Sequence, residues 1–165
     1  MRRAGWRSLV RAAAFVLLAL AAPAARAVTS CSVAASGVNF GIYNPLAGSP
    51  TNSTGSVTVT CTLLSGGATT VNLTAALSAG SSGNFTTRTM LAGVNKLKYN
   101  LYWSTAYAQV WGDGTGGSFY GVASIALTPG NPTQAVSGTM YGQISAGQDV
   151  GPGAYLDTIV VTVSY

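Results

Sequence analysis

The residues of this chain that could act as acids, bases or nucleophiles are few. The 165-residue sequence has no His, three acidic residues in total and only 7% charged residues. General acid–base catalysis depends mostly on His, Asp and Glu, and a Ser or Thr nucleophile needs a neighbouring base. Lys96 and Lys98 are the candidate bases, but they alternate with apolar residues, which is typical of the solvent-facing side of a strand. The sequence therefore predicts no catalytic residues and no enzyme activity.

Metal and cofactor sites lack ligands in this sequence. Asp113 opens the glycine-rich run at residues 113–117, but one carboxylate among glycines offers too few oxygen atoms to hold Ca²⁺. Cys31 and Cys61 have no His and no third Cys with which to complete a zinc site. We expect no metal and no cofactor, and we interpret the run as a turn that follows a packed Trp111.

The two cysteines favour a disulfide. An even number of cysteines in an exported chain is typical of disulfide pairing. A bond between Cys31 and Cys61 would close a loop of about 30 residues, which contributes about 3–4 kcal/mol of stability in the chain-entropy account. Two free thiols are the alternative.

The first 27 residues have the three parts of a secretory signal peptide. The basic part contains Arg2, Arg3, Arg7 and Arg11, the apolar part is residues 12–22, and Ala25-Arg26-Ala27 is a small-x-small cleavage site. A membrane-spanning helix needs about 20 apolar residues, and Pro23 ends this run too early. We expect cleavage after Ala27, export through the inner membrane to the periplasm, and then the cell surface or the extracellular space. No integral membrane segment is expected after cleavage.

Removal of this peptide changes the charge of the protein. The full chain has a formal charge of +5 and a sequence pI near 9.5, but most of its basic residues lie in the signal peptide. The mature chain keeps Arg88, Lys96 and Lys98 against three Asp residues, so its net charge is zero. A basic patch for nucleic acid is therefore absent, and we exclude nucleic-acid binding.

The mature chain, residues 28–165, is predicted to form one all-β domain. It is rich in Gly, Ser, Thr and Asn, and its apolar residues recur at every second position, as in 97–103 and 159–165. This period is typical of half-buried antiparallel strands packed as a sandwich. The expected strands cover residues 32–43, 53–63, 69–78, 84–90, 96–103, 107–112, 119–127 or 134–144, and 154–165.

The last predicted strand has an unprotected edge. Residues 158–165 are apolar or uncharged, and they contain no Lys or Pro of the kind that usually blocks pairing at an exposed edge. Its inward face would consist of Ile159, Val161, Val163 and Tyr165. We therefore expect this strand to receive another strand.

Several short pieces, spread in order from Cys31 to Tyr165, resemble one family. They are Cys31-Ser-Val, residues 38–45, residues 55–61, Arg88-Thr-Met90, residues 97–102, residues 110–114, residues 141–144, Gly147-Gln148, and Gly153-x-Tyr155-x-Asp157 with the closing Tyr165. This set resembles the spore coat protein U domain, shared by secreted coat proteins and by pilins of archaic chaperone–usher pili. The resemblance implies an incomplete immunoglobulin-like sandwich without its last strand.

The resemblance also implies the partners. A periplasmic chaperone first fills the gap, an outer-membrane usher takes part in assembly, and the N-terminal extension of a neighbouring pilin or coat subunit later replaces the chaperone. In polymerising pilins this extension precedes the first cysteine, whereas here only Val28, Thr29 and Ser30 lie between the cleavage site and Cys31. The chain could thus be a free coat protein, a chain-ending subunit or an atypical pilin.

A second class of function is a stand-alone secreted adhesin or binding module. Phe119 and Tyr120 lie between two glycines and could form an exposed aromatic loop tip. Ordinary packing of both rings in the core is the competing interpretation.

Overall fold

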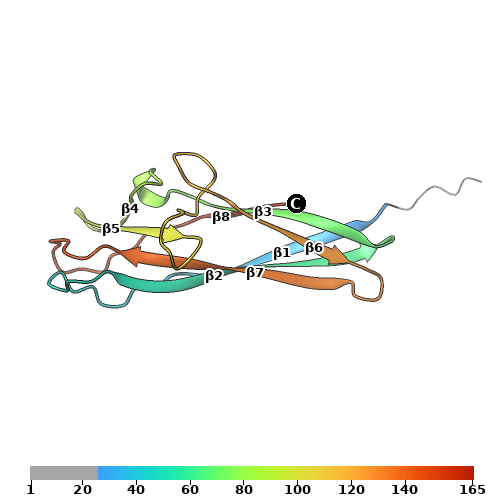
Figure 1. The fold of residues 1–165 in the computed structure, drawn as a ribbon, viewed down its shortest axis with the longest axis horizontal. Coiled ribbons are helices and arrows are strands. Elements are labelled where there is room, and N and C mark those ends of the chain that lie inside the picture. The colour runs from blue at the N-terminus through green and yellow to red at the C-terminus, as the bar shows by residue number, and fades with distance from the viewer. Residues whose placement is uncertain (1–25) are drawn as a thin grey trace, which may run out of the picture.

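The structure is a computed structural model that describes residues 26–165 (Figure 1). The predicted signal peptide lies almost wholly outside the described residues, so it stays a prediction. The strands are β1 (Val28–Ser36), β2 (Thr51–Ser65), β3 (Thr69–Leu77), β4 (Arg88–Ala92), β5 (Asn95–Tyr102), β6 (Gly121–Leu127), β7 (Thr133–Ile144) and β8 (Val161–Ser164), with one 3₁₀ turn, η1 (Gly80–Ser82). In the part described, no helix is long and apolar enough to cross a membrane.

The strands form two antiparallel sheets packed face to face. One sheet has the order β1-β2-β7-β5-β4, and the other has the order β6-β3-β8. This immunoglobulin-like sandwich confirms the predicted all-β fold. It also places β8 at the edge of the smaller sheet, as the sequence predicted.

The larger sheet is staggered along its length. β1 pairs with residues 56–65 of β2, whereas β5 pairs with residues 141–144 at the far end of β7. The two outer parts of this sheet therefore lie at opposite ends of the elongated molecule (Figure 1). Beyond Ser36, the chain leaves β1 without a strand on either side.

Four predicted strands were wrong in extent. Of residues 84–90, only 88–90 lie in a strand, β4. Residues 37–43 are not part of a strand, because β1 loses its partner after Ser36 and Gly41 adopts a positive φ of 67°. Residues 107–112 form only isolated bridges, Tyr102 with Val110 and Trp111 with Phe119. Of residues 154–165, only Val161–Ser164 form a regular strand. The alternative between 119–127 and 134–144 was unnecessary, because both regions are strands, β6 and β7.

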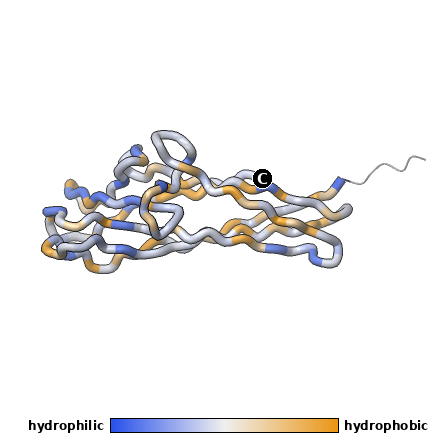
Figure 2. Tube along the Cα trace, viewed as in Figure 1, coloured by the Kyte–Doolittle hydropathy of each residue, from blue (hydrophilic) through white to orange (hydrophobic). Residues whose placement is uncertain are grey.

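The core follows the alternation in the sequence. The inward residues are Val57, Val59 and Cys61 in β2, Val71, Leu73 and Leu77 in β3, and Leu97, Tyr99 and Leu101 in β5, all of them buried. Apolar and polar residues alternate along the strands in Figure 2. Trp111 is also buried, with 1% of its surface exposed, and its indole N–H donates to Ala75 O at 2.9 Å.

The disulfide between Cys31 and Cys61 is present and joins β1 to β2. Cys61 is fully buried, and the two cysteines face each other in the register of the two strands. Because β1 has a partner on one side only, this bond holds the edge strand to the sheet.

Replacing both cysteines with serine is expected to lower the free energy of unfolding by about 3–4 kcal/mol, since the bond closes a 30-residue separation. Urea unfolding of the mature chain measures this. Reduced wild-type protein is the control and should match the double variant. Two alkylatable thiols in protein from the periplasm, or equal stability of the oxidised and reduced forms, would show that the bond plays no such part.

Candidate strand-acceptor groove

Two unpaired backbone edges face each other across the open side of the sandwich. β1 pairs with β2 alone, and β8 pairs with β3 alone. The chain that follows β1 and the chain that precedes β8 run along the two sides of one groove. We call them the β1 wall (residues 35–45) and the β8 wall (residues 150–161).

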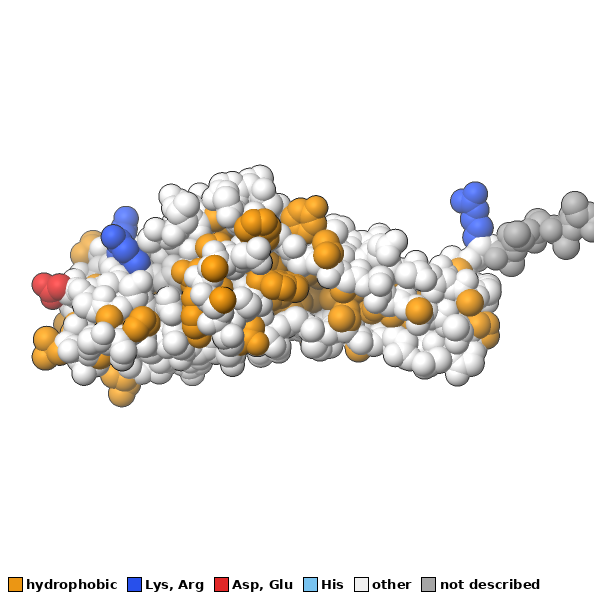
Figure 3. Space-filling view, in the orientation of Figure 1, with side chains coloured by type: hydrophobic (Ala, Val, Ile, Leu, Met, Phe, Trp, Pro, Cys, Tyr) orange, Lys and Arg blue, Asp and Glu red, His pale blue; other side chains and the backbone are white. Residues whose placement is uncertain are grey.

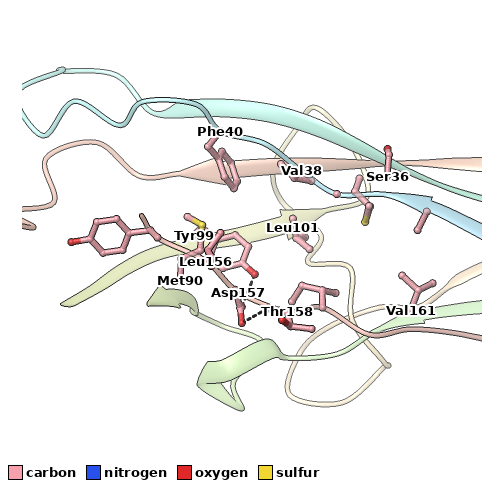
Figure 4. Close-up of a pocket in the computed structure, with 15 residues that line it drawn as sticks. Ser36, Val38, Phe40, Met90, Tyr99, Leu101, Leu156, Asp157, Thr158 and Val161 are labelled. Atoms are coloured by element: carbon pink, nitrogen blue, oxygen red, sulfur yellow. Dashed lines mark hydrogen bonds between the residues drawn. The ribbon is translucent and has the colours of Figure 1, made fainter. Parts of the chain in front are cut away.

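The groove between these walls is apolar and has a volume of about 430 Å³. Figure 4 shows side chains from both walls pointing into it, together with core residues that form its floor. The lining consists of Ala35, Ser36, Gly37, Val38 and Phe40 from the β1 wall, Met90, Tyr99, Leu101 and Met140 from the floor, and residues 155–159 with Val161 from the β8 side. Asp157 is the one charged residue among them.

A second chamber of about 900 Å³ continues the groove towards the end of the molecule. It shares Val38, Phe40 and Tyr155 with the first chamber and reaches Tyr43 and Val150. The open side therefore extends along the whole β1 wall and most of the β8 wall. This length suits an extended strand rather than a compact ligand.

The β1 wall crosses the inner face of the larger sheet where that face lacks side chains. A Cβ atom at Gly142 would lie 2.6 Å from Val38 and 2.7 Å from Phe40, and one at Gly55 would lie 2.6 Å from Ser36 O. The absence of these two Cβ atoms lets the wall lie close to β2 and β7. The Phe40 ring then packs edge-on against Tyr99, with the ring centroids 5.9 Å apart.

The β8 wall passes from one sheet to the other. Leu156 forms an isolated bridge with Leu91 of β4, in the larger sheet, whereas Val161 pairs with Leu77 of β3, in the smaller one. A chain that changes sheets cannot keep a continuous ladder with either. This explains why residues 154–160 are not a regular strand, although their side chains alternate like one.

Asp157 fixes the middle of this crossing. Its carboxylate accepts hydrogen bonds from Tyr99 Oη at 2.7 Å, from Ser81 N at 2.8 Å and Oγ at 2.6 Å, and from Thr158 N at 2.8 Å. Burial and the bond to Asp157 raise the pKa of Tyr99 well above its usual value, so the phenol stays protonated and donates. The groove's one charge is thus occupied by partners within the chain.

Arg88, the first residue of β4, is fully buried. Its guanidinium donates to Ser78 O at 2.8 and 3.0 Å, to Trp111 O at 2.8 Å and to Asn100 Oδ1 at 2.8 Å, and all of these acceptors are neutral. Burial lowers its pKa. Sequence reasoning did not identify this cluster, and the only signal was an isolated Arg at the start of a short apolar strand.

The four residues predicted to line the groove lie in different surroundings. Ile159 and Val161 line the groove. Val163 packs instead against the core cluster at the other end of the sandwich, and Tyr165 is 63% exposed. Sequence reasoning missed the opposite wall, although Val38, Phe40 and Tyr43 form an apolar series in an uncharged stretch.

The remaining candidates lie away from the groove's apolar lining. Lys96 and Lys98 are exposed on β5, as expected. Asp113 accepts hydrogen bonds from Thr115 Oγ1 and N, which lower its pKa and form the expected turn. Phe119 and Tyr120 are 53% and 49% exposed, so neither ring is enclosed in the core.

Comparison with known proteins gives the family of this fold. Residues 16–162 match the family described as the Spore Coat Protein U domain. The chain belongs to this family. One relative of this spore coat U chain is Protein U of Myxococcus xanthus, which is 34% identical over 137 residues, covering 78% of this chain and 71% of the relative. The family resemblance found in the sequence is thereby confirmed.

A solved structure shares the fold. It is a chain of the CsuC–CsuE chaperone–tip adhesion subunit pre-assembly complex from the archaic chaperone–usher Csu pili of Acinetobacter baumannii. The TM-score is 0.50 at 22% identity, and the match covers 84% of this spore coat U chain. It spans only 40% of that other chain.

Replacing Gly142 with alanine is expected to displace the β1 wall, because the new Cβ would overlap Val38 and Phe40. We expect a loss of about 1–3 kcal/mol in the free energy of unfolding, as for other overpacked sites. Chemical denaturation measures it. Combining the change with Val38→Ala should restore part of the loss. Gly130→Ala is the control, since nothing lies within 4 Å of a Cβ there; equal effects of both glycine variants would contradict the crossing.

Proposed function

We propose that this chain is an exported, non-enzymatic structural subunit of a bacterial surface pilus or coat. It accepts a β-strand from a chaperone or a neighbouring subunit along the groove between the β1 wall and the β8 wall. The observation that carries the proposal is the pair of unpaired backbone edges that face each other across an apolar floor. The family membership and the shared fold with a chain of a chaperone–subunit complex support it.

The groove's chemistry describes the strand that would fill it. The strand must place apolar side chains inward at every second position, because the floor consists of residues such as Met90, Leu101 and Met140. Its N–H and C=O groups would pair with the free edges on both sides. Charged inward residues are unsuitable, since Asp157 already has partners for its oxygen atoms.

The expected gain in stability is large for a domain of this size. Each large apolar side chain moved from water into such a groove contributes about 1.5–3 kcal/mol. Two or three inserted side chains would therefore contribute roughly 3–9 kcal/mol, compared with about 5–15 kcal/mol for the whole stability of a typical domain. The unfilled domain is then marginal, which explains the need for a chaperone in transit.

A second candidate function is adhesion through an aromatic surface. Trp103, Phe119, Tyr120 and Val122 are all at least 41% exposed, and a slot of about 150 Å³ lies beside Trp103. Figure 3 shows hydrophobic side chains gathered around a hollow in the middle of the visible face. Binding of the purified monomer to a carbohydrate or to a surface would favour this function over assembly.

The proposal is tested by fusing a short strand of alternating valine and threonine after Tyr165 through a flexible linker. The added strand can turn back beside β8 and enter the groove, so the fused form should melt roughly 10 °C or more above the bare mature chain. Thermal unfolding followed by circular dichroism measures the difference. The bare chain should aggregate or bind a chaperone.

The control carries the same linker and a strand in which serine replaces every valine. It can pair its backbone but cannot fill the apolar floor, so we expect little gain. If the bare chain is monomeric, unfolds cooperatively and gains nothing from the apolar strand, the sandwich is already complete. The chain would then be a free-standing secreted module.

A further inference from the structure

The sulfur atoms that an oxidant could attack are concentrated in the groove. The predicted mature chain, residues 28–165, has two cysteines and two methionines, and both cysteines are in the disulfide. Its remaining sulfur atoms are the thioethers of Met90 in β4 and Met140 in β7. Both side chains line the groove of about 430 Å³ (Figure 4). Every methionine of the mature chain therefore belongs to one site.

The two methionines lie between the core and the groove. Met90 and Met140 are 9% and 4% exposed and belong to the same core cluster. Met90 also lines the larger chamber, so both chambers of the groove reach it. A Cβ atom at Gly55 would lie 2.9 Å from Met140 Cε and 2.6 Å from Ser36 O. The end of the Met140 side chain thus lies close to the point where β1 loses its ladder.

Oxidation would make this apolar floor polar. Hydrogen peroxide converts a thioether to a sulfoxide. The sulfur lone pair attacks one peroxide oxygen, the O–O bond breaks, and the second oxygen takes the proton of the first and leaves as water. The sulfur loses the two electrons that the peroxide gains. The new oxygen is a hydrogen-bond acceptor, and burying an acceptor without a donor is costly. The phenol of Tyr99, which also lines the groove, already donates to Asp157.

On the basis of the proposed function, we propose that Met90 and Met140 are oxidation sites through which a peroxide closes the groove to an incoming strand. In the empty groove, the peroxide reaches both sulfur atoms, and water solvates the sulfoxide oxygens that form. A seated strand places apolar side chains on the same floor and excludes both the peroxide and that water. The reduced floor therefore accepts a strand, the oxidised floor rejects it, and an occupied groove protects its own methionines.

The cost of oxidation falls mainly on the filled form. A sulfoxide oxygen beneath a seated strand loses the water that solvates it in the empty groove. Oxidation therefore lowers the stability of the filled form more than that of the empty form. The affinity for a free strand and the stability gained from a fused strand must consequently fall together.

The first measurement follows the oxidation of each methionine by dilute hydrogen peroxide, using mass spectrometry of peptides from the treated protein. Met90 and Met140 in the bare mature chain should gain oxygen about tenfold faster than in the form fused to the valine–threonine strand, because the fused strand must leave before the peroxide enters. The fusion whose strand has serine in place of valine is the control, and we expect it to protect much less.

The second measurement is the dissociation constant of the valine–threonine strand, added as a free peptide to the mature chain before and after peroxide treatment. We expect treatment to raise it about tenfold, as for one polar group buried without a partner. The gain in melting temperature from the fused strand should shrink in parallel when the fused chain is oxidised in denaturant and refolded. The matched variant combines Met90→Leu with Met140→Leu, which replaces both thioethers by hydrocarbon of similar volume. Its dissociation constant should not change on peroxide treatment.

The outcomes separate this inference from the proposed function. Equal oxidation rates in the bare and fused forms, or unchanged affinity after oxidation, would overturn the inference while the proposed function stands. The inference also fails if peroxide weakens peptide binding by the leucine variant, since other residues would then be responsible. Loss of cooperative unfolding in the oxidised bare chain would likewise overturn it, because the sulfoxides would then act on the core. If the reduced chain binds no strand and gains no stability from a fused one, both proposals fail.

Discussion

The constraint on which this structure depends is the backbone of two strands with no partner on their outer side. Water can satisfy the exposed N–H and C=O groups along the β1 wall and the β8 wall, but it cannot favourably cover the apolar floor between them. An added strand would satisfy both requirements, since it brings paired peptide groups and inward apolar side chains together, and the proposed function depends on this. Both segments that border this gap, residues 37–43 and 154–160, depart from regular strand structure.

The buried Arg88 connects elements of both sheets. Its guanidinium connects the end of β3, through Ser78 O, to Asn100 in β5 and to the carbonyl of Trp111. Burying a cation is costly unless its donors are satisfied, and here several neutral oxygen atoms satisfy them. Ser78 also exchanges hydrogen bonds with Val160, so the same junction that receives Arg88 holds the β8 wall. On the other side of the gap, the disulfide holds β1 to β2.

Much of the fold could be predicted from the sequence, because period-two alternation and the near-absence of Glu and Lys leave few choices. The edge position of β8 followed from its uncharged, unblocked sequence, and the disulfide followed from an even count of cysteines. The β1 wall could not be found in this way. Val38 and Phe40 alternate like strand residues, and nothing local indicates that Gly55 and Gly142, far away in the chain, open a path across the sheet for them. Tyr165 was predicted to face inward because the alternation of apolar residues continues to it. Its side chain is exposed, because the core ends before it.

The charge distribution limits how a partner can be recognised. The predicted mature chain carries no net charge, and the one carboxylate in the groove is bonded to Tyr99, Ser81 and Thr158. The chain's charge therefore contributes little to the long-range attraction of a partner. Ion pairs between a partner and the groove cannot supply specificity, because the groove's one carboxylate is already bonded. Recognition must come from shape, from apolar burial and from backbone pairing, which are nearly independent of salt. Under the proposed function, a seated strand would be held by buried apolar side chains and paired peptide groups, so a change in salt concentration would alter its affinity little.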